Sequence, residues 1–411
     1  MKKLLMASLV SLATAGAFAQ PAQTVKIASL DMLSGPMAGL GNNVLKGFQH
    51  VAKVANDEAW AGPVKFEIVP FDNKASPQEA LALLTTIIGQ NIHYVVQGAS
   101  SSSVGIALQT AIERHNERNP GKEIVFLNYA AQAPVMTNAN CSYWHFRFDA
   151  HSDMKVGALT TYLAQQKDIK KVYLINPNYA YGQETARASR EMLAAKRPDV
   201  TIVGEDLHPT GQVKDFAPYM AKIKQSGADA VITASWGSDL SLMIRAAKDF
   251  GLTTQFYTFN ANNYGVPGAM GGAGEGHVKL VSPFNPNDAK PRTPTLLADF
   301  KKQYNEDFIL GTGYNAVAGL AQAIKQAQSA EPGKVAAQLE GLRFQGLDGP
   351  VELRKADHQA QQAIYVQSWE KVDGKAVVYD QENTGFGWKE VRAIDAKGAE
   401  QPTTCAMKRP T

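Results

Sequence analysis

The stretch that decides the fold is residues 93–115, HYVVQGASSSSVGIALQTAIERH. Its apolar run, 94–97, predicts a buried strand, and a helical pattern follows over 102–115. Four consecutive serines, 100–103, stand where the strand ends and the helix begins. A helix N-terminus has free N–H groups and a partial positive charge. The serines are therefore interpreted either as a plain helix cap or as a seat for a bound anion.

Strand-like runs alternate with amphipathic helices on both sides of this unit. In the first part of the chain we expect strands over 25–33, 64–70, 94–97 and 124–127, and helices over 40–56, 77–89 and 102–115. A second set follows, with helices over 154–165, 185–195, 216–224 and 240–250, and strands over 171–175, 201–205, 228–234 and 255–258. This alternation predicts an α/β fold with parallel sheets and helices on both faces.

After Pro283 the pattern changes. Helices are predicted over 296–304, 313–327 and 335–342, followed by short strands over 344–346, 351–353, 364–370 and 375–379. We expect the helical block to return to the first α/β unit and the final strands to return to the second. The chain would then cross several times between two domains that have a cleft between them.

The first residues are typical of a secretory signal peptide. Met1-Lys2-Lys3 is basic, residues 4–18 are apolar, and Ala17-Phe18-Ala19 matches the pattern for cleavage after Ala19. The apolar run is shorter than the ~20 residues of a membrane-spanning helix, so a membrane anchor is the weaker alternative. No cysteine stands at the cleavage site, which argues against a lipoprotein.

Composition excludes some partners and suggests one cross-link. The chain has 411 residues, 45% of them hydrophobic, which is enough for two hydrophobic cores. Its net charge is +3. Lys and Arg form no dense patch, so we expect no nucleic-acid partner. Cys141 and Cys405 are the only cysteines, and export favours a disulfide between them over two buried free thiols.

The sequence shows no convincing catalytic or metal-binding motif. It has no G-x-S-x-G, no H-E-x-x-H and no P-loop, and its eight histidines never stand at metal-ligand spacing. The loop 128–134 follows a predicted strand, and ligands in open α/β sheets bind at the carboxyl ends of strands. The alternative for this loop is a turn fixed by Pro134. We expect a binding protein with no enzyme activity, no metal and no cofactor.

Six segments in order resemble the leucine/isoleucine/valine-binding family of type I periplasmic binding proteins, the receptors of ABC importers. They are LSGPMAGLG (33–41), DNKASPQEAL (72–81), GASSSSVG (98–105), QAPVMT (132–137), NPNYAYGQE (176–184) and AAKDFGLTTQF (246–256). The resemblance implies two Rossmann-like lobes joined by a three-segment hinge. After a signal peptide at 1–19, the expected ranges are 20–149 with 284–357 for lobe 1, and 150–283 with 358–411 for lobe 2.

The resemblance also assigns a ligand site by position. Ser101, with Ser102 beside it, matches the serine whose hydroxyl contacts the ligand carboxylate, and Ala130 matches a carbonyl that accepts from the ligand's amino group. Gln132 stands where amino-acid binders have a threonine, so only the backbone N–H of that contact is kept. Tyr181 and Trp236 match two tyrosines of the second lobe, and both can close over an apolar group or a ring.

Two positions depart from the amino-acid binders. Asn260 stands where they carry a glutamate for the ligand ammonium, and Leu40 replaces an aromatic residue. A buried ammonium without a carboxylate partner is costly. The implied ligand is a small carboxylate-bearing solute: a branched-chain or other amino acid, or an aromatic or other organic acid. Amides and urea-like ligands are further alternatives.

The resemblance thus implies a periplasmic solute-binding receptor, expected to be a monomer, that delivers its ligand to the membrane permease of an ABC importer. A periplasmic sensor subunit is one alternative. An exported α/β hydrolase is another, disfavoured by the missing nucleophile–base set. A disulfide between Cys141 and Cys405 would tie the chain end across the base of the lobes, away from the ligand mouth.

Overall fold

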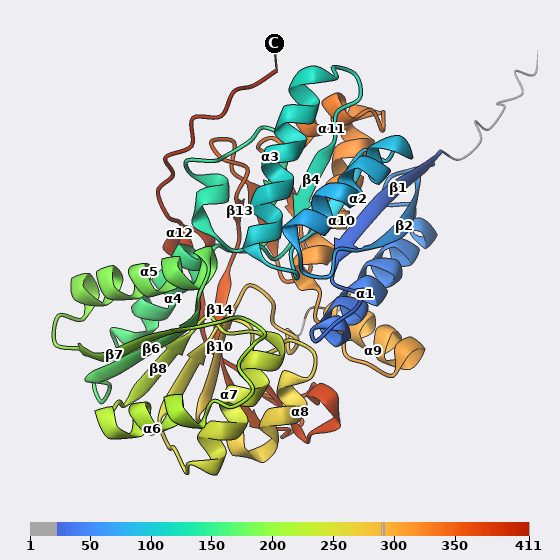
Figure 1. Cartoon of the computed structure of the whole chain (residues 1–411). Helices are drawn as coiled ribbons and strands as arrows, with labels where there is room; N and C mark the ends of the chain where they lie inside the picture. The colour runs from blue at the N-terminus through green and yellow to red at the C-terminus, as the bar shows by residue number, and fades with distance from the viewer. Residues whose placement is uncertain (1–22, 289, 291, 411) are drawn as a thin grey trace, which may run out of the picture.

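The computed structural model describes residues 23–288, 290 and 292–410, which form two α/β lobes (Figure 1). Each lobe has a mainly parallel sheet with helices packed against it, so the predicted fold class is confirmed. The expected signal peptide, residues 1–19, and its cleavage site lie outside the described residues. In the part of the chain that is described, no helix has both the length and the hydropathy needed to cross a membrane.

The first lobe is built on a five-stranded sheet in the order β2-β1-β3-β4-β5, with every neighbouring pair parallel. Its strands are β1 (Thr24–Asp31), β2 (Lys65–Asp72), β3 (Tyr94–Gln97), β4 (Val125–Asn128) and β5 (His145–Arg147). The helices along this part of the chain are α1 (Ala38–Asp57), α2 (Pro77–Gly89), α3 (Ser102–Arg118) and the short 3₁₀ helix η1 (Pro134–Thr137). Strands β3 and β4 are buried along their whole length, as expected for central strands of a parallel sheet.

The second lobe has a seven-stranded sheet in the order β15-β14-β10-β9-β8-β6-β7. Its strands are β6 (Lys171–Pro177), β7 (Thr201–His208), β8 (Ala230–Thr233), β9 (Gln255–Thr258), β10 (Val278–Ser282), β14 (Ile364–Lys371) and β15 (Phe386–Ile394). Strands β6 to β10 are parallel, whereas β14 and β15 are added antiparallel at one edge. The helices are α4 (Ser152–Leu163), α5 (Ala180–Lys196), α6 (Ala217–Ser226), α7 (Gly237–Asp249), α8 (Val266–Met270) and the 3₁₀ helix η2 (Gly271–Gly274).

The third part of the chain divides between the lobes. Its helices are α9 (Arg292–Tyr304), α10 (Gly311–Ala327) and α11 (Pro332–Leu339), and α9 and α10 both contact α1 of the first lobe. A small antiparallel sheet follows, made of β11 (Arg343–Gln345), β12 (Pro350–Leu353) and β13 (Ala360–Gln361). The chain then re-enters the second lobe as β14, the 3₁₀ helix η3 (Gln381–Asn383), β15 and the short helix α12 (Ala396–Ala399).

The predicted strand over 375–379 is wrong, because side chains satisfy its backbone. Asp373 Oδ1 accepts from the N–H groups of Lys375 and Val377 at 2.8 and 2.9 Å. Asn287 Oδ1 accepts from the next two N–H groups at 2.7 and 2.8 Å. The strand that follows β14 in the sheet is instead β15, which the sequence did not suggest since five consecutive residues of this edge strand are exposed.

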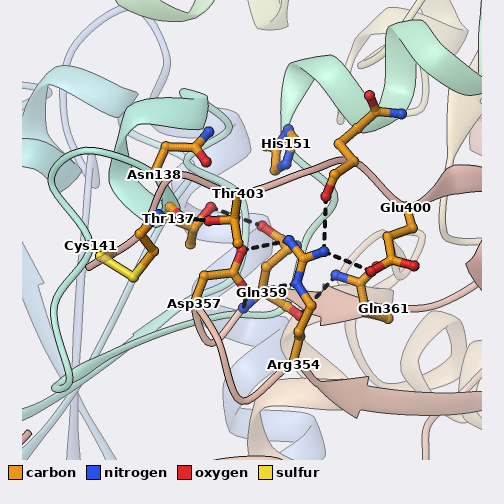
Figure 2. A network of polar contacts seen from close by, with 12 residues as sticks. Thr137, Asn138, Cys141, His151, Arg354, Asp357, Gln359, Gln361, Glu400 and Thr403 are labelled. Carbon is orange, nitrogen blue, oxygen red and sulfur yellow. Dashed lines mark hydrogen bonds and ion pairs between the residues drawn. A yellow bond between two sulfur atoms is a disulfide. The ribbon is translucent and has the colours of Figure 1, made fainter. Parts of the chain in front are cut away.

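The chain end leaves the second lobe and returns to the first (Figure 1). Its residues 400–410 carry no helix or strand, and the structure contains the expected disulfide between Cys405 and Cys141. Figure 2 shows Arg354 joined to Asp357 and Glu400. The two distances are 2.6 and 2.8 Å, and Arg354 also donates to the carbonyl of Gln401 at 2.9 Å. The expected range 358–411 placed this tail with lobe 2, whereas its last residues contact lobe 1.

Candidate ligand-binding site

A cavity lies between the lobes at the carboxyl ends of the strands, with about 760 Å³ of space that is partly open to solvent. The structure brings all seven sequence-predicted residues to its lining: Ser101, Ser102, Ala130, Gln132, Tyr181, Trp236 and Asn260. Leu40 also lines it, as does a set of residues that were not predicted: Tyr129, Asp149, Lys155, Tyr179, Phe259 and Phe284. The site thus forms only when both lobes are in place.

The serine run is divided among three tasks. Ser101 is the N-cap of α3, since its Oγ accepts from Val104 N at 3.3 Å, and it also faces the cavity. Ser100 is buried and points back into the lobe, while Ser102 Oγ accepts from Ala133 N at 3.1 Å. The N–H groups of Ser102 and Ser103 lie in the first helical turn, where no intrahelical carbonyl can reach them. The cap and the anion seat are therefore compatible uses of one loop.

Asp31, at the end of β1, holds the serine loop in place through hydrogen bonds. Its carboxylate accepts from the Ser100 N–H at 3.0 Å and from the Ser100 hydroxyl at 2.9 Å, and also from the Tyr129 hydroxyl. Burial raises the pKa of Asp31 to about 6, although these hydrogen bonds oppose the rise. Gly98 lets the loop approach the next strand, because a Cβ there would meet Ala130 N at 2.4 Å.

The loop after β4 forms the other half of the first-lobe wall. Asn128 Oδ1 accepts from the N–H groups of Ala130 and Ala131 at 3.2 and 2.8 Å, so a buried side chain shapes the turn. Pro134 then opens η1, which agrees with its predicted role as a turn former. Ala130 and Gln132 are thereby held at the cavity surface beside the serine loop.

Aromatic residues and neutral polar groups of the second lobe line the opposite side of the cavity. Trp236 Nε1 donates to the Tyr179 hydroxyl at 3.0 Å, and Asn260 Nδ2 donates to the Tyr181 hydroxyl at 3.1 Å. Burial raises the pKa of both tyrosines, so their hydroxyls stay protonated at neutral pH. Phe259 adds a further ring to the lining. These rings offer a flat apolar surface to a ligand, with hydroxyl and amide groups at its edge.

One hydrogen bond crosses the cavity between the lobes. Gln132 Nε2 of the first lobe donates to Asn260 Oδ1 of the second at 3.2 Å. Gln132 Oε1 is buried and has no hydrogen-bond partner in the described part of the chain. Gln132 and Asn260, which stand where amino-acid binders have a threonine and a glutamate, thus face each other across the cleft and link the two lobes.

The sequence analysis missed an ion pair in this cavity. Lys155 Nζ, on α4, donates to Asp149 Oδ2 at 3.0 Å, and both side chains line the cavity. A signal for it was present, because Lys155 is the only charged residue of the predicted helix 154–165, and a lysine on a buried face needs a partner.

A serine–histidine–aspartate group occurs in the second lobe but does not face the cavity. His208 Nε2 lies 2.8 Å from Ser235 Oγ, and His208 Nδ1 lies 3.9 Å from Asp239 Oδ2. Ser235 and His208 are completely buried, and Ser235 is not part of the cavity lining. A nucleophile must reach the bound substrate, so this group offers no route to hydrolysis of a cleft ligand. Over the described residues, no three His, Cys, Asp or Glu side chains are placed to hold a metal ion.

Two hinged α/β lobes with a partly aromatic cavity between the carboxyl ends of their strands define a solute-binding protein. Residues 24–375 match the family model described as "Periplasmic binding protein", and the chain belongs to this family. It is 28% identical over 410 residues to "Leu/Ile/Val-binding protein homolog 4" of Brucella abortus (strain 2308), covering 97% of this chain and 96% of that protein.

Solved structures show the same fold. The leucine-, isoleucine-, valine-, threonine- and alanine-binding protein from Brucella ovis, in its closed conformation, is 27% identical with a TM-score of 0.81, covering 95% of this chain and 100% of that one. A solute-binding protein of an ABC transporter from R. palustris, in complex with 4-hydroxybenzoate, is 20% identical with a TM-score of 0.76, covering 91% and 97%. At 20% identity, the similarity to the structure from R. palustris concerns the fold alone.

Proposed function

We propose that this protein is a periplasmic receptor that binds a small carboxylate-bearing solute between its lobes and delivers it to the permease of an ABC importer. The observation that carries the proposal is the first turn of α3, where the Ser101 hydroxyl and the free N–H group of Ser102 stand at the cavity wall. The protein acts as a monomer, performs no chemistry on the ligand, and reaches the periplasm by its signal peptide.

The residues that the second lobe contributes to the cavity indicate which class of ligand fits. Asn260 is neutral and already donates to Tyr181, so nothing at this position compensates a ligand ammonium. Rings line this side of the cavity, with Trp236 only 7% exposed. We therefore favour an aromatic or other organic acid over a branched-chain amino acid. What the relatives' names say of amino acids and 4-hydroxybenzoate supports carboxylates as the common class.

A thermal-shift screen over amino acids and aromatic acids, followed by calorimetric titration of the best ligand, tests the proposal. A ligand stabilises the folded protein in proportion to the logarithm of its concentration over Kd. Ser101→Ala should raise the Kd of that ligand on the order of tenfold, because one hydrogen bond to a charged group is lost. Ser103→Ala is the matched control, since Ser103 belongs to the same run but does not line the cavity.

Two outcomes would contradict parts of this proposal. Large shifts with leucine-type amino acids and none with aryl acids would overturn the argument from Asn260. Equal affinity in Ser101→Ala and wild type would make the serine run a helix cap only. The sensor alternative uses the same cleft, so the partner separates the two roles: adjacent genes for a permease and an ATPase favour import.

A further inference from the structure

The cavity contains an ion pair at the point where the lobes join. Asp149 lies in the connection between β5 and α4, and Lys155 lies in the first turn of α4. Lys155 Nζ and Asp149 Oδ2 are 3.0 Å apart, and the side chains are only 3% and 6% exposed. A charged pair is thus built into a wall that is otherwise made of neutral groups.

Stability does not explain this pair. Removing two charges from water costs several kcal/mol per ion, and replacing a buried pair by apolar residues is often neutral or stabilising. A cation in the first turn of a helix also opposes the helix dipole. Burial lowers the pKa of Lys155 and raises that of Asp149, in both cases against the charged form. Local rules broken at a cavity wall are characteristic of a functional site.

The pair has unused hydrogen-bonding capacity on both sides. An ammonium group has three N–H donors, and the one hydrogen bond of Lys155 Nζ goes to Asp149 in the described part of the chain. Asp149 Oδ1 is buried and has no hydrogen-bond partner there. A buried acceptor without a partner costs about 1–3 kcal/mol, so a ligand that supplies the donor gains by doing so.

The charges around the pair define which ligand group fits. Asp149 and Lys155 are the only Asp, Glu, Lys, Arg or His residues in the cavity lining of the described chain, and their charges cancel. A ligand ammonium would lie near the Lys155 cation, while Asp149 is already compensated. A second ligand carboxylate would lie near Asp149 in the same way. An uncharged group that both donates and accepts meets neither repulsion.

We propose that Asp149 and Lys155 form a second polar subsite, which selects carboxylates whose other end carries a hydroxyl or a carboxamide. The subsite rests on the proposed function, because the ligand carboxylate is taken to lie at the first turn of α3. Asp149 Oδ1 accepts from the ligand's O–H or N–H, and Lys155 donates to its oxygen. The pair thereby distinguishes bifunctional acids from plain hydrocarbon acids and from amino acids.

Titration of the wild-type protein with two matched ligand series provides the first test. One series is benzoate with a para methyl, hydroxymethyl, carbamoyl or aminomethyl group, and the other is the corresponding set on linear pentanoate. The best hydroxyl or carboxamide ligand should bind on the order of tenfold more tightly than its methyl counterpart. The ammonium ligand should bind more weakly than the methyl one.

The second test removes the pair without leaving a lone charge. In the double variant Asp149→Asn/Lys155→Met the polar preference should fall below about threefold, while the methyl ligand keeps its affinity. The matched control is Lys170→Met/Asp199→Asn, which removes a pair with a 2.6 Å separation that is 53% and 45% exposed and lies outside the cavity. This control should leave the affinity for every ligand unchanged.

The outcomes separate the subsite from the proposed function. A polar preference that survives in the double variant, or an ammonium ligand that binds tightest to wild type, contradicts the subsite alone. Carboxylates of both series that fail to bind wild type at all contradict the proposed function and the subsite with it. Circular dichroism and thermal unfolding check that the double variant folds; if it does not, the rank order in wild type still decides.

Discussion

The two lobes meet at the cleft, at the hinge, and where residues 379–382 contact Lys301 and Asp307. The contacts at the cleft and at the hinge differ in kind. At the cleft, the bond from Gln132 to Asn260 is a neutral hydrogen bond of 3.2 Å between side chains that also line the ligand cavity. At the hinge, a buried arginine, two glutamines and a disulfide join the connecting segments. The first contact can be exchanged for contacts to a ligand, whereas the second persists.

Arg147 is the centre of the hinge contact. Its Nε donates to Gln359 Oε1 at 2.6 Å, and its NH1 donates to the carbonyl of Ala133 at 2.7 Å. Gln359 Nε2 in turn donates to the carbonyl of Asp149 at 2.8 Å. The first and third connections between the lobes therefore run side by side and are joined by buried hydrogen bonds. Buried hydrogen-bond networks resist deformation, so closure must occur around them.

The largest loss of stability is expected when Arg147, the buried cation of the hinge, is replaced. Arg147→Met removes the buried donors to Gln359 Oε1 and to the carbonyls of Ala131 and Ala133, and should lower the free energy of unfolding by about 3–5 kcal/mol. Urea unfolding measures this. The matched control is Arg343→Met, at a residue whose side chain is 78% exposed, with an expected change within about 0.5 kcal/mol. Equal effects of the two substitutions would remove the contrast between hinge and surface.

A smaller loss of stability is expected when the disulfide between Cys405 and Cys141 is removed. The cysteines are separated by 264 residues, and in the chain-entropy model a disulfide that closes so long a loop stabilises mainly by restricting the unfolded chain. Cys405→Ser should lower the free energy of unfolding by about 2–4 kcal/mol. Wild type measured in reductant should then match the variant. Unchanged stability in the variant would show that the noncovalent contacts of the tail suffice.

The smallest change in stability is expected at the cleft, together with the largest change in shape. Gln132→Ala removes the bridging hydrogen bond and should lower the free energy of unfolding by about 1 kcal/mol or less. Small-angle scattering without ligand should show a larger radius of gyration, because the lobes separate more readily. Gln183→Ala is the control, since Gln183 bonds Asn178 within the second lobe. Identical scattering of the two variants would mean that other contacts hold the lobes together.

The serine loop shows what local sequence can and cannot predict. Four serines at a strand–helix junction predict either a helix cap or an anion seat; Ser101 caps α3 and also lines the cavity. Which serine does which task depended on Asp31, a residue of another strand that turns Ser100 inward. The partners of a side chain come from strands distant in sequence, so the division of tasks required the assembled sheet.

Two misses have the same physical origin. The segment 375–379 has the composition of a strand, but Asp373 and Asn287 occupy its N–H groups, so its backbone cannot join the sheet. Lys155 was overlooked because a lysine within a helix is usually solvated, and only the packing of α4 against the hinge buries it beside Asp149. Both outcomes depend on neighbours that no local pattern specifies.

The sequence by itself determined the alternation of strands and helices, the fold class and the pairing of the only two cysteines, since these follow from periodicity and composition. The family resemblance, carried by the order of motifs, assigned seven residues of the cavity lining. Tertiary structure alone decided that Gln132 bonds Asn260, that Lys155 meets Asp149, and that the tail crosses back to the first lobe. Hydrophobic periodicity is a local property that each segment carries. Polar partners across a cleft or a hinge are fixed only when two lobes pack together and water is excluded.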